Sequence, residues 1–219
     1  MRGALIVVVA LLGFAACASA QDKLEIKRIA IWPPVFLEGN GPCKNETAIR
    51  TAKDAMAKII QQIGFETVDE GKVAGAIRQL GIGSADKDVR SLPDPEQMLK
   101  LGEAIEADYV LAYRCAWRAK SVWVALGPKT KAHCRTSVLI VNVATGEIDY
   151  NPEPVEADST KKESTAETAA SLLISMGFTA LSGGPKTPHM QRAAQLSIVE
   201  VMDRWVAPRM PQAKRKIRE

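Results

Sequence analysis

Histidine is scarce in this chain, and the short motifs of common hydrolases are missing. The 219 residues include two histidines, His133 and His189, and no H-E-x-x-H or G-x-S-x-G motif. Because a serine or cysteine nucleophile is usually activated by a histidine base, these absences argue against a hydrolase built on a local motif. Residues 183–187 (GGPKT) resemble a phosphate-binding loop in composition only, since the spacer between the glycines is missing. We therefore predict no catalytic residues and no cofactor.

The chain also lacks a strong net charge. Its 29 basic and 25 acidic residues give +4 at pH 7. A charge this small does not favour nucleic acid as a partner. Much of the basic excess lies in residues 207–219, which follow the last helical pattern and indicate a flexible basic tail. Such a tail either stays solvated or touches an acidic surface.

Only the N-terminal segment forms a long apolar run. Residues 3–16 are almost entirely apolar, and residues 18–20 (Ala-Ser-Ala) have the small-x-small pattern of a signal-peptidase site. We expect residues 1–20 to be a secretory signal peptide and the protein to be exported to the periplasm. A second interpretation stays open, because residues 14–17 (FAAC) resemble a lipobox. In that case Cys17 is lipidated and anchors the protein to the outer membrane.

Besides Cys17, the chain has three cysteines, Cys43, Cys115 and Cys134. In an oxidising compartment two of them are expected to pair. Cys115 and Cys134 are the best candidates, because each lies in one arm of a predicted β-hairpin, and Cys43 then stays free. Such a bridge closes a loop of about 20 residues and contributes on the order of 3 kcal/mol in the chain-entropy model. A zinc site with His133 fits poorly, since the spacings match no familiar metal signature, and we predict no metal site.

Cap residues and apolar spacing predict the helices. Asn45 is placed to cap a helix that runs to about Ile63, and Asp94-Pro95 is a strong helix start. Between them, a shorter helix ends near Gly81, where a left-handed residue is favoured. Further helical patterns cover residues 166–176 and 188–206.

Alternating and continuous apolar patterns predict the strands. The predicted strands are residues 24–32, 65–68, 109–117, 132–143 and 147–150. The glycine- and proline-containing segment 36–44 is predicted to be a loop. No linker divides the chain, so we expect one α/β domain over residues 24–206. Its architecture is a sandwich, with a mixed β-sheet of four or five strands packed by helices.

Three of these segments, taken in order, resemble a known group of domains. They are residues 29–34 (IAIWPP), 101–111 (LGEAIEADYVL) and 141–148 (VNVATGEI). This order is similar to that in the bacterial envelope family of the curli-secretion lipoprotein CsgG, the N-terminal domain of TolB and the penicillin-binding-protein activator LpoB. The resemblance implies a small α/β sandwich, and no catalytic residues accompany its motifs.

The same resemblance implies a role in binding. Members of this group bind other envelope proteins or assemble into secretion machinery. We therefore expect a non-catalytic exported protein that binds another envelope component, as an accessory to assembly, secretion or cell-wall synthesis. Two other classes stay open. One is a periplasmic carrier of a small ligand, and the other is a secreted hydrolase that would depend on His133 or His189.

The expected docking surface is the hairpin of residues 114–135. On strand 109–117, alternate residues place three aromatic side chains on one face and Arg114 and Arg118 on the other. If helices cover the aromatic face, the arginine face is open, and the reverse arrangement would leave an aromatic patch exposed. Trp123 lies near the hairpin tip, where burial is harder, and is the preferred contact residue. Arg114 and Arg118 are the other partner-contact candidates.

Overall fold

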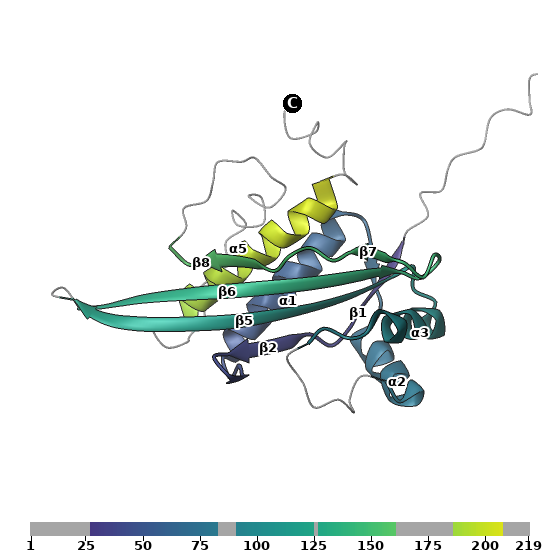
Figure 1. The fold of residues 1–219 in the computed structure, drawn as a ribbon, viewed down its shortest axis with the longest axis horizontal. Coiled ribbons are helices and arrows are strands. Elements are labelled where there is room, and N and C mark those ends of the chain that lie inside the picture. The colour runs from purple at the N-terminus through teal and green to yellow at the C-terminus, as the bar shows by residue number, and fades with distance from the viewer. Residues whose placement is uncertain (1–26, 83–90, 125–126, 161–185, 208–219) are drawn as a thin grey trace, which may run out of the picture.

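The computed structural model describes residues 27–82, 91–124, 127–160 and 186–207 (Figure 1). For residues 121–124 and 127–129 it describes the backbone alone. The predicted signal peptide with Cys17, the helical pattern at 166–176 and the basic tail beyond residue 207 lie outside the described residues.

Two long antiparallel strands form the centre of the fold. β5 (Tyr109–Val124) and β6 (Gly127–Asn142) pair along their whole length, from Tyr109 opposite Asn142 to Val124 opposite Gly127. This pair runs lengthwise through the molecule (Figure 1). Every other described strand joins the sheet directly or indirectly through one of these two.

Six shorter strands extend this pair on both sides. Their bounds are β1 (Arg28–Ile31), β2 (Val35–Glu38), β3 (Gly41–Pro42), β4 (Glu66–Thr67), β7 (Ile148–Tyr150) and β8 (Val155–Asp158). β1 and β2 pair in parallel with β5, while β7 and β8 pair antiparallel with β6. β4 joins β1, and β3 joins β2. The predicted α/β class with a mixed sheet is confirmed, with eight strands in the described residues where the sequence predicts four or five.

The strand predictions differ from the structure in three places. The predicted loop 36–44 contains most of β2 and all of β3. The two central strands are longer than predicted, and residues 155–158 form β8, where no strand is predicted. β2 and β8 pair with residues far along the chain, at Arg114–Trp117 and His133–Thr136, so the local sequence pattern does not reveal these two strands.

Helices α1 (Glu46–Gln62) and α5 (Thr187–Val206) lie side by side on one face of the sheet (Figure 1). They cover the aromatic face of β5, so the first of the two predicted alternatives is correct. Tyr113 and Trp117 are buried there, and Phe36 of β2 packs against both with ring centroids 6.0 and 5.9 Å away. We call this side the helix-covered face.

Hydrogen bonds hold the beginning of α5 in place. The indole Nε1 of Trp117 donates to the carbonyl of Met190 at 2.9 Å. The amide Nδ2 of Asn45 donates to Thr187 Oγ1 at 2.8 Å, while its Oδ1 accepts from the backbone N–H of Ala48 at 3.0 Å. The residue predicted to cap α1 therefore does so and also holds the first turn of α5.

On the opposite face of the sheet, the described helices cover one end only. α2 (Glu70–Leu80) and α3 (Pro95–Ile105) pack there on Val110 and Ala112 of β5 and on Leu139 and Val141 of β6. The next residue of β5 on this face is Arg114, and the charged positions begin where the apolar cover ends. The extent of α2 and α3 thus determines how much of the sheet is open.

Gly102 allows α3 to approach the sheet closely. A Cβ at this position would overlap a methyl group of Val143 and lie 2.9 Å from a methyl group of Val110. Val110 is fully buried and its branched side chain has little rotational freedom, so neither neighbour can move away easily. The close approach therefore depends on glycine.

We expect Gly102→Ala to lower the free energy of unfolding by about 1–3 kcal/mol, because it overpacks the contact between α3 and the sheet. Gly75→Ala in α2 is the matched control, since a Cβ there meets no atom within 4 Å. That control should stabilise the protein by about 0.5–1 kcal/mol through helix propensity. Urea denaturation measures both, and equal effects of the two substitutions would contradict the close approach.

Candidate functional site

Beyond the cover of α2 and α3, the sheet is open and positively charged. Along β5 and β6 buried residues alternate with exposed ones, so that Trp117 and Cys134 face the helices while their neighbours Arg118 and Arg135 face solvent. We call the open surface the basic face, and it comprises Arg114, Arg118, Lys120, Lys131 and Arg135. The sequence predicts Arg114 and Arg118 as contact residues, and the structure adds the other three.

The register places like charges side by side on the basic face. These like charges are Lys120 and Lys131, which lie directly opposite each other in the β5–β6 ladder. Like charges in directly opposed positions destabilise a sheet. In the part of the chain that the structure describes, no carboxylate forms an ion pair with Arg118, Lys120 or Arg135. This arrangement therefore works against the stability of the isolated domain.

Arg114 occupies the inner end of the basic face. Its Nη2 donates to Ser137 Oγ at 3.4 Å, across the β5–β6 ladder. Its Nε is buried and has no hydrogen-bond partner among the described residues. On the other side of Arg114, Val35 of β2 is its neighbour in the sheet. The guanidinium is thus fixed in position while most of its donors remain available.

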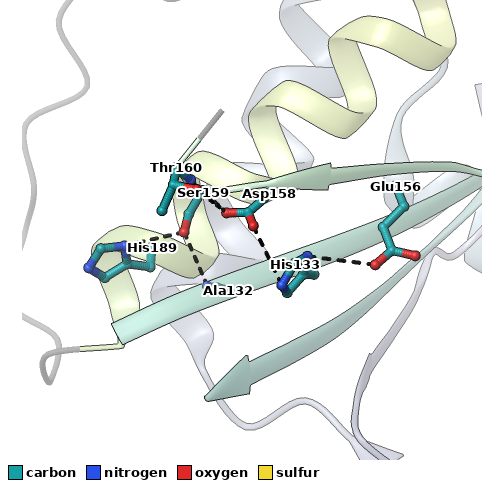
Figure 2. Close-up of polar contacts among 7 residues, drawn as sticks. All are labelled: Ala132, His133, Glu156, Asp158, Ser159, Thr160 and His189. Carbon is teal, nitrogen blue, oxygen red and sulfur yellow. Dashed lines mark hydrogen bonds and ion pairs between the residues drawn. The ribbon is translucent and has the colours of Figure 1, made fainter. Parts of the chain in front are cut away.

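An acidic border runs beside the basic face on β8. His133 lies between two carboxylates, with Nδ1 3.7 Å from Glu156 Oε1 and Nε2 3.5 Å from Asp158 Oδ2 (Figure 2). The backbone N–H of Thr160 holds the pKa of Asp158 below its ordinary value, and the Thr160 hydroxyl, His133 and Lys131 act in the same direction. The open surface therefore has a basic centre and a negatively charged edge.

The lowered pKa of Asp158 predicts a pH dependence of stability. The folded protein holds this proton less readily than the unfolded chain, so the stabilisation is complete above the ordinary pKa of 3.8 and is lost as the pH falls below it. In urea denaturation between about pH 6 and pH 2.5, Asp158→Asn should lose less stability than the wild type. If the free energy of unfolding falls equally with pH in the wild type and in Asp158→Asn, the lowered pKa of Asp158 is contradicted.

Ser159 and His189 form a contact that resembles part of a hydrolase site. His189 Nδ1 lies 3.3 Å from Ser159 Oγ, which also accepts a hydrogen bond from the backbone N–H of Ala132 at 3.1 Å (Figure 2). The serine is buried, and no carboxylate among the described residues hydrogen-bonds His189 to orient its ring. The contact joins the end of β8 to β6 and to the first turn of α5, which is a structural role.

The cysteines lie in the core beneath α1 and α5. Cys115 and Cys134 are diagonal neighbours across the ladder, and both have Thr136 Oγ1 nearby, at 3.6 and 3.9 Å from their Sγ atoms. Burial raises the pKa of the Cys115 thiol well above its ordinary value. Burial acts in the same direction on Cys134, but hydrogen bonds with Cys115, Ser197 and Thr136 outweigh it and lower that pKa. Both residues are free thiols here, so the predicted bridge is not confirmed.

A labelling experiment distinguishes the free thiols from the predicted bridge. Unfolding the protein without reductant in the presence of iodoacetamide should alkylate Cys43, Cys115 and Cys134, because the structure holds all three as free, buried thiols. Peptide mapping by mass spectrometry assigns the labels. The folded protein is the control and should react slowly at these positions. Labelling of Cys43 without the other two would contradict the free thiols and confirm the bridge.

At the far end of the basic face, β5 and β6 continue as a two-stranded arm, which comprises residues 119–124 and 127–131 and carries Lys120 and Lys131 of that face. β2 reaches β5 only as far as Trp117, and β8 reaches β6 only as far as His133. Within the sheet, the two halves of the arm therefore pair only with each other. The arm extends past the helices and shorter strands (Figure 1). Trp123 lies in it opposite Pro128, and its side chain is outside the description.

The described residues contain no group of three or more histidine, cysteine, aspartate or glutamate side chains that could hold a metal ion. None of the described helices is long and apolar enough to cross a membrane.

No protein-family model and no curated protein matches this chain. Among solved structures, lipoprotein GNA1162 from Neisseria meningitidis is 17% identical, with a TM-score of 0.42, over 68% of this chain and 93% of the other. The LpoB C-terminal domain from Salmonella enterica is 18% identical, with a TM-score of 0.38, over 60% and 81%. The hypothetical protein CT253 from Chlamydia trachomatis is 15% identical, with a TM-score of 0.42, over 82% and 95%.

LpoB is one of the three proteins named in the resemblance drawn from the sequence, and a specific relation to CsgG or TolB stays a prediction. At these identities the likeness assigns no residue role and no partner to this chain.

Proposed function

We propose that this chain is a non-catalytic, exported protein of the bacterial envelope that binds another envelope protein. In this role it is an accessory to assembly, secretion or cell-wall synthesis. The observation that carries the proposal is the β5–β6 arm, which continues beyond every other strand that pairs with β5 or β6. The arm continues from an open face on which Arg118, Lys120 and Arg135 form no ion pair among the described residues.

The physical argument starts from the stability of such an arm. A two-stranded ribbon without further partners is only marginally stable in water. No other described strand pairs with either edge of the arm, and a strand edge of this kind invites association with another chain. Residues 119–124 and 127–131 contribute no strand pairing to the rest of the sheet. A binding role for the arm accounts for its length, because a partner strand or surface would complete it.

The position of the N-terminal strand fits this role. β1 pairs with the beginning of β5, at Tyr109 to Leu111, and the arm is formed by the other end of that strand. β1 therefore lies at the end of the central strand pair away from the arm (Figure 1). If export leaves a lipid on Cys17, the tether enters the domain through β1, which pairs with the end of β5 away from the arm. If cleavage follows Ala20 instead, the same surface is presented by a freely diffusing protein.

We expect Trp123→Ala to reduce capture of the partner by site-specific crosslinking in the envelope, without changing the urea midpoint. The reason is that tryptophan is frequent among interface anchors, and truncating such an anchor often costs about 2 kcal/mol or more of binding energy. Ile148→Ala on β7 is the matched control, since Ile148 is an exposed apolar residue away from the arm. Unchanged capture by Trp123→Ala would rule out the arm tip as the contact. Loss of capture in both variants would show that the effect is not local.

A further inference from the structure

We propose that the basic face binds an extended acidic segment of a protein partner, in which carboxylates recur at every second residue. This inference rests on the proposed function and names the chemistry of the partner that the function requires. Three features carry it: the spacing of the positive charges, their direct opposition across the ladder and the composition of the surface on either side.

The spacing of the charges matches a strand-like ligand. Arg118 and Lys120 are two residues apart on β5 and lie on the same face, about 6.8 Å apart along the strand. An extended peptide has the same two-residue repeat, so alternate carboxylates would meet successive basic side chains. From Arg114 to Lys120 the face spans roughly 20 Å, which is about six residues of extended chain. A helical ligand has a period of about 3.6 residues and would match fewer of these positions.

The repulsion between opposed like charges on the basic face favours the binding of an anion. Lys120 faces Lys131 directly, and both are exposed. Each carboxylate placed between the two lysines would turn a repulsion into a pair of attractions. Arg114 can add a charge-assisted hydrogen bond through its terminal guanidinium nitrogens, of which Nη2 also lies 3.4 Å from Ser137 Oγ.

A simpler explanation for the lysines is protection of the arm. Lysine on an unpaired ribbon discourages pairing with other chains, and this role requires charge but no particular sign. Glutamate at the same positions would protect the ribbon equally well. Binding to an acidic segment does require positive charge, so reversing the sign separates the two explanations.

The borders of the face favour a protein over an anionic membrane. On one side, Glu156 and Asp158 of β8 carry negative charge beside the basic residues. On the other side, β2 places the half-buried Val35 and Leu37 next to Arg114 and Ala116. A uniformly anionic lipid surface would be repelled by the two carboxylates and would gain little from a partly buried apolar strip. A polypeptide can match a basic centre, an acidic border and an apolar border together.

The test uses the full chain and a synthetic peptide of about twelve residues with alternating glutamate and threonine, which is long enough to span the face. The double variant Arg118→Glu/Lys120→Glu should bind this peptide about tenfold more weakly or worse than the wild type. It should instead bind a peptide with alternating lysine and threonine, which the wild type should not. This gain of binding shows that the variant is folded, and a circular dichroism spectrum provides a second check.

The matched control is Arg50→Glu/Lys100→Glu, which makes the same change in net charge at exposed positions on α1 and α3. This control should keep the wild-type affinity for the acidic peptide. Wild-type binding should also weaken steeply between about 0.05 and 0.5 M sodium chloride, as expected for exposed charges. A peptide with glutamine in place of glutamate should not bind.

Three results would overturn the inference. The first is equal affinity of the wild type and Arg118→Glu/Lys120→Glu for the acidic peptide. The second is an equal loss of that affinity in Arg50→Glu/Lys100→Glu. The third is binding of the wild type to phosphatidylglycerol vesicles without binding to the peptide.

Crosslinking in the envelope distinguishes failure of this inference from failure of the proposed function. If a partner is still captured and capture is insensitive to the face variant, the proposed function stands and the acidic ligand does not. If no envelope protein is captured at all, the proposed function fails.

Discussion

The register of β5 against β6 is the constraint on which the rest of the structure depends. Side chains alternate across a strand, so shifting one strand by a single residue would place its charged positions beneath α1 and α5. Trp117 and Cys134 are directly opposite each other in the ladder, and after such a shift their side chains would lie on opposite faces of the sheet. The same two strands also carry the pairing sites of β1, β2, β7 and β8. Core, open surface and strand order are therefore consequences of one alignment.

Much of the fold can be predicted from the sequence where local chemistry determines it. Asn45 caps α1, Asp94 and Pro95 begin α3, and Gly81 ends α2 in the left-handed conformation, with φ at 63°. β2 and β8 were not predictable in this way. Each is only four residues long and is stabilised by pairing with residues far along the chain. Local propensity is weak evidence for strands of that kind.

The candidate site was only partly visible in the sequence. The alternation along β5 identified Arg114 and Arg118 but left open which face the helices cover, because that depends on where α1 and α5 pack. Lys120 continues the same alternation, so it could have been added by extending the strand beyond Trp117. Glu156 could not, since its place beside His133 depends on the pairing of β6 with β8. Contacts between distant segments are what sequence periodicity leaves undetermined.

The order of elements along the chain has a consequence for how the protein is made. α5 supplies ten buried residues to the core, and it is the last helix of the described chain. Synthesis proceeds from the N-terminus, so the apolar sides of α1 and β5 have no cover until α5 has left the ribosome. Contacts between segments this far apart in sequence also form slowly. A nascent chain therefore stays incompletely packed until α5 has been made. In a chain that is exported, as we propose, the same delay keeps it unfolded for threading through a secretion channel.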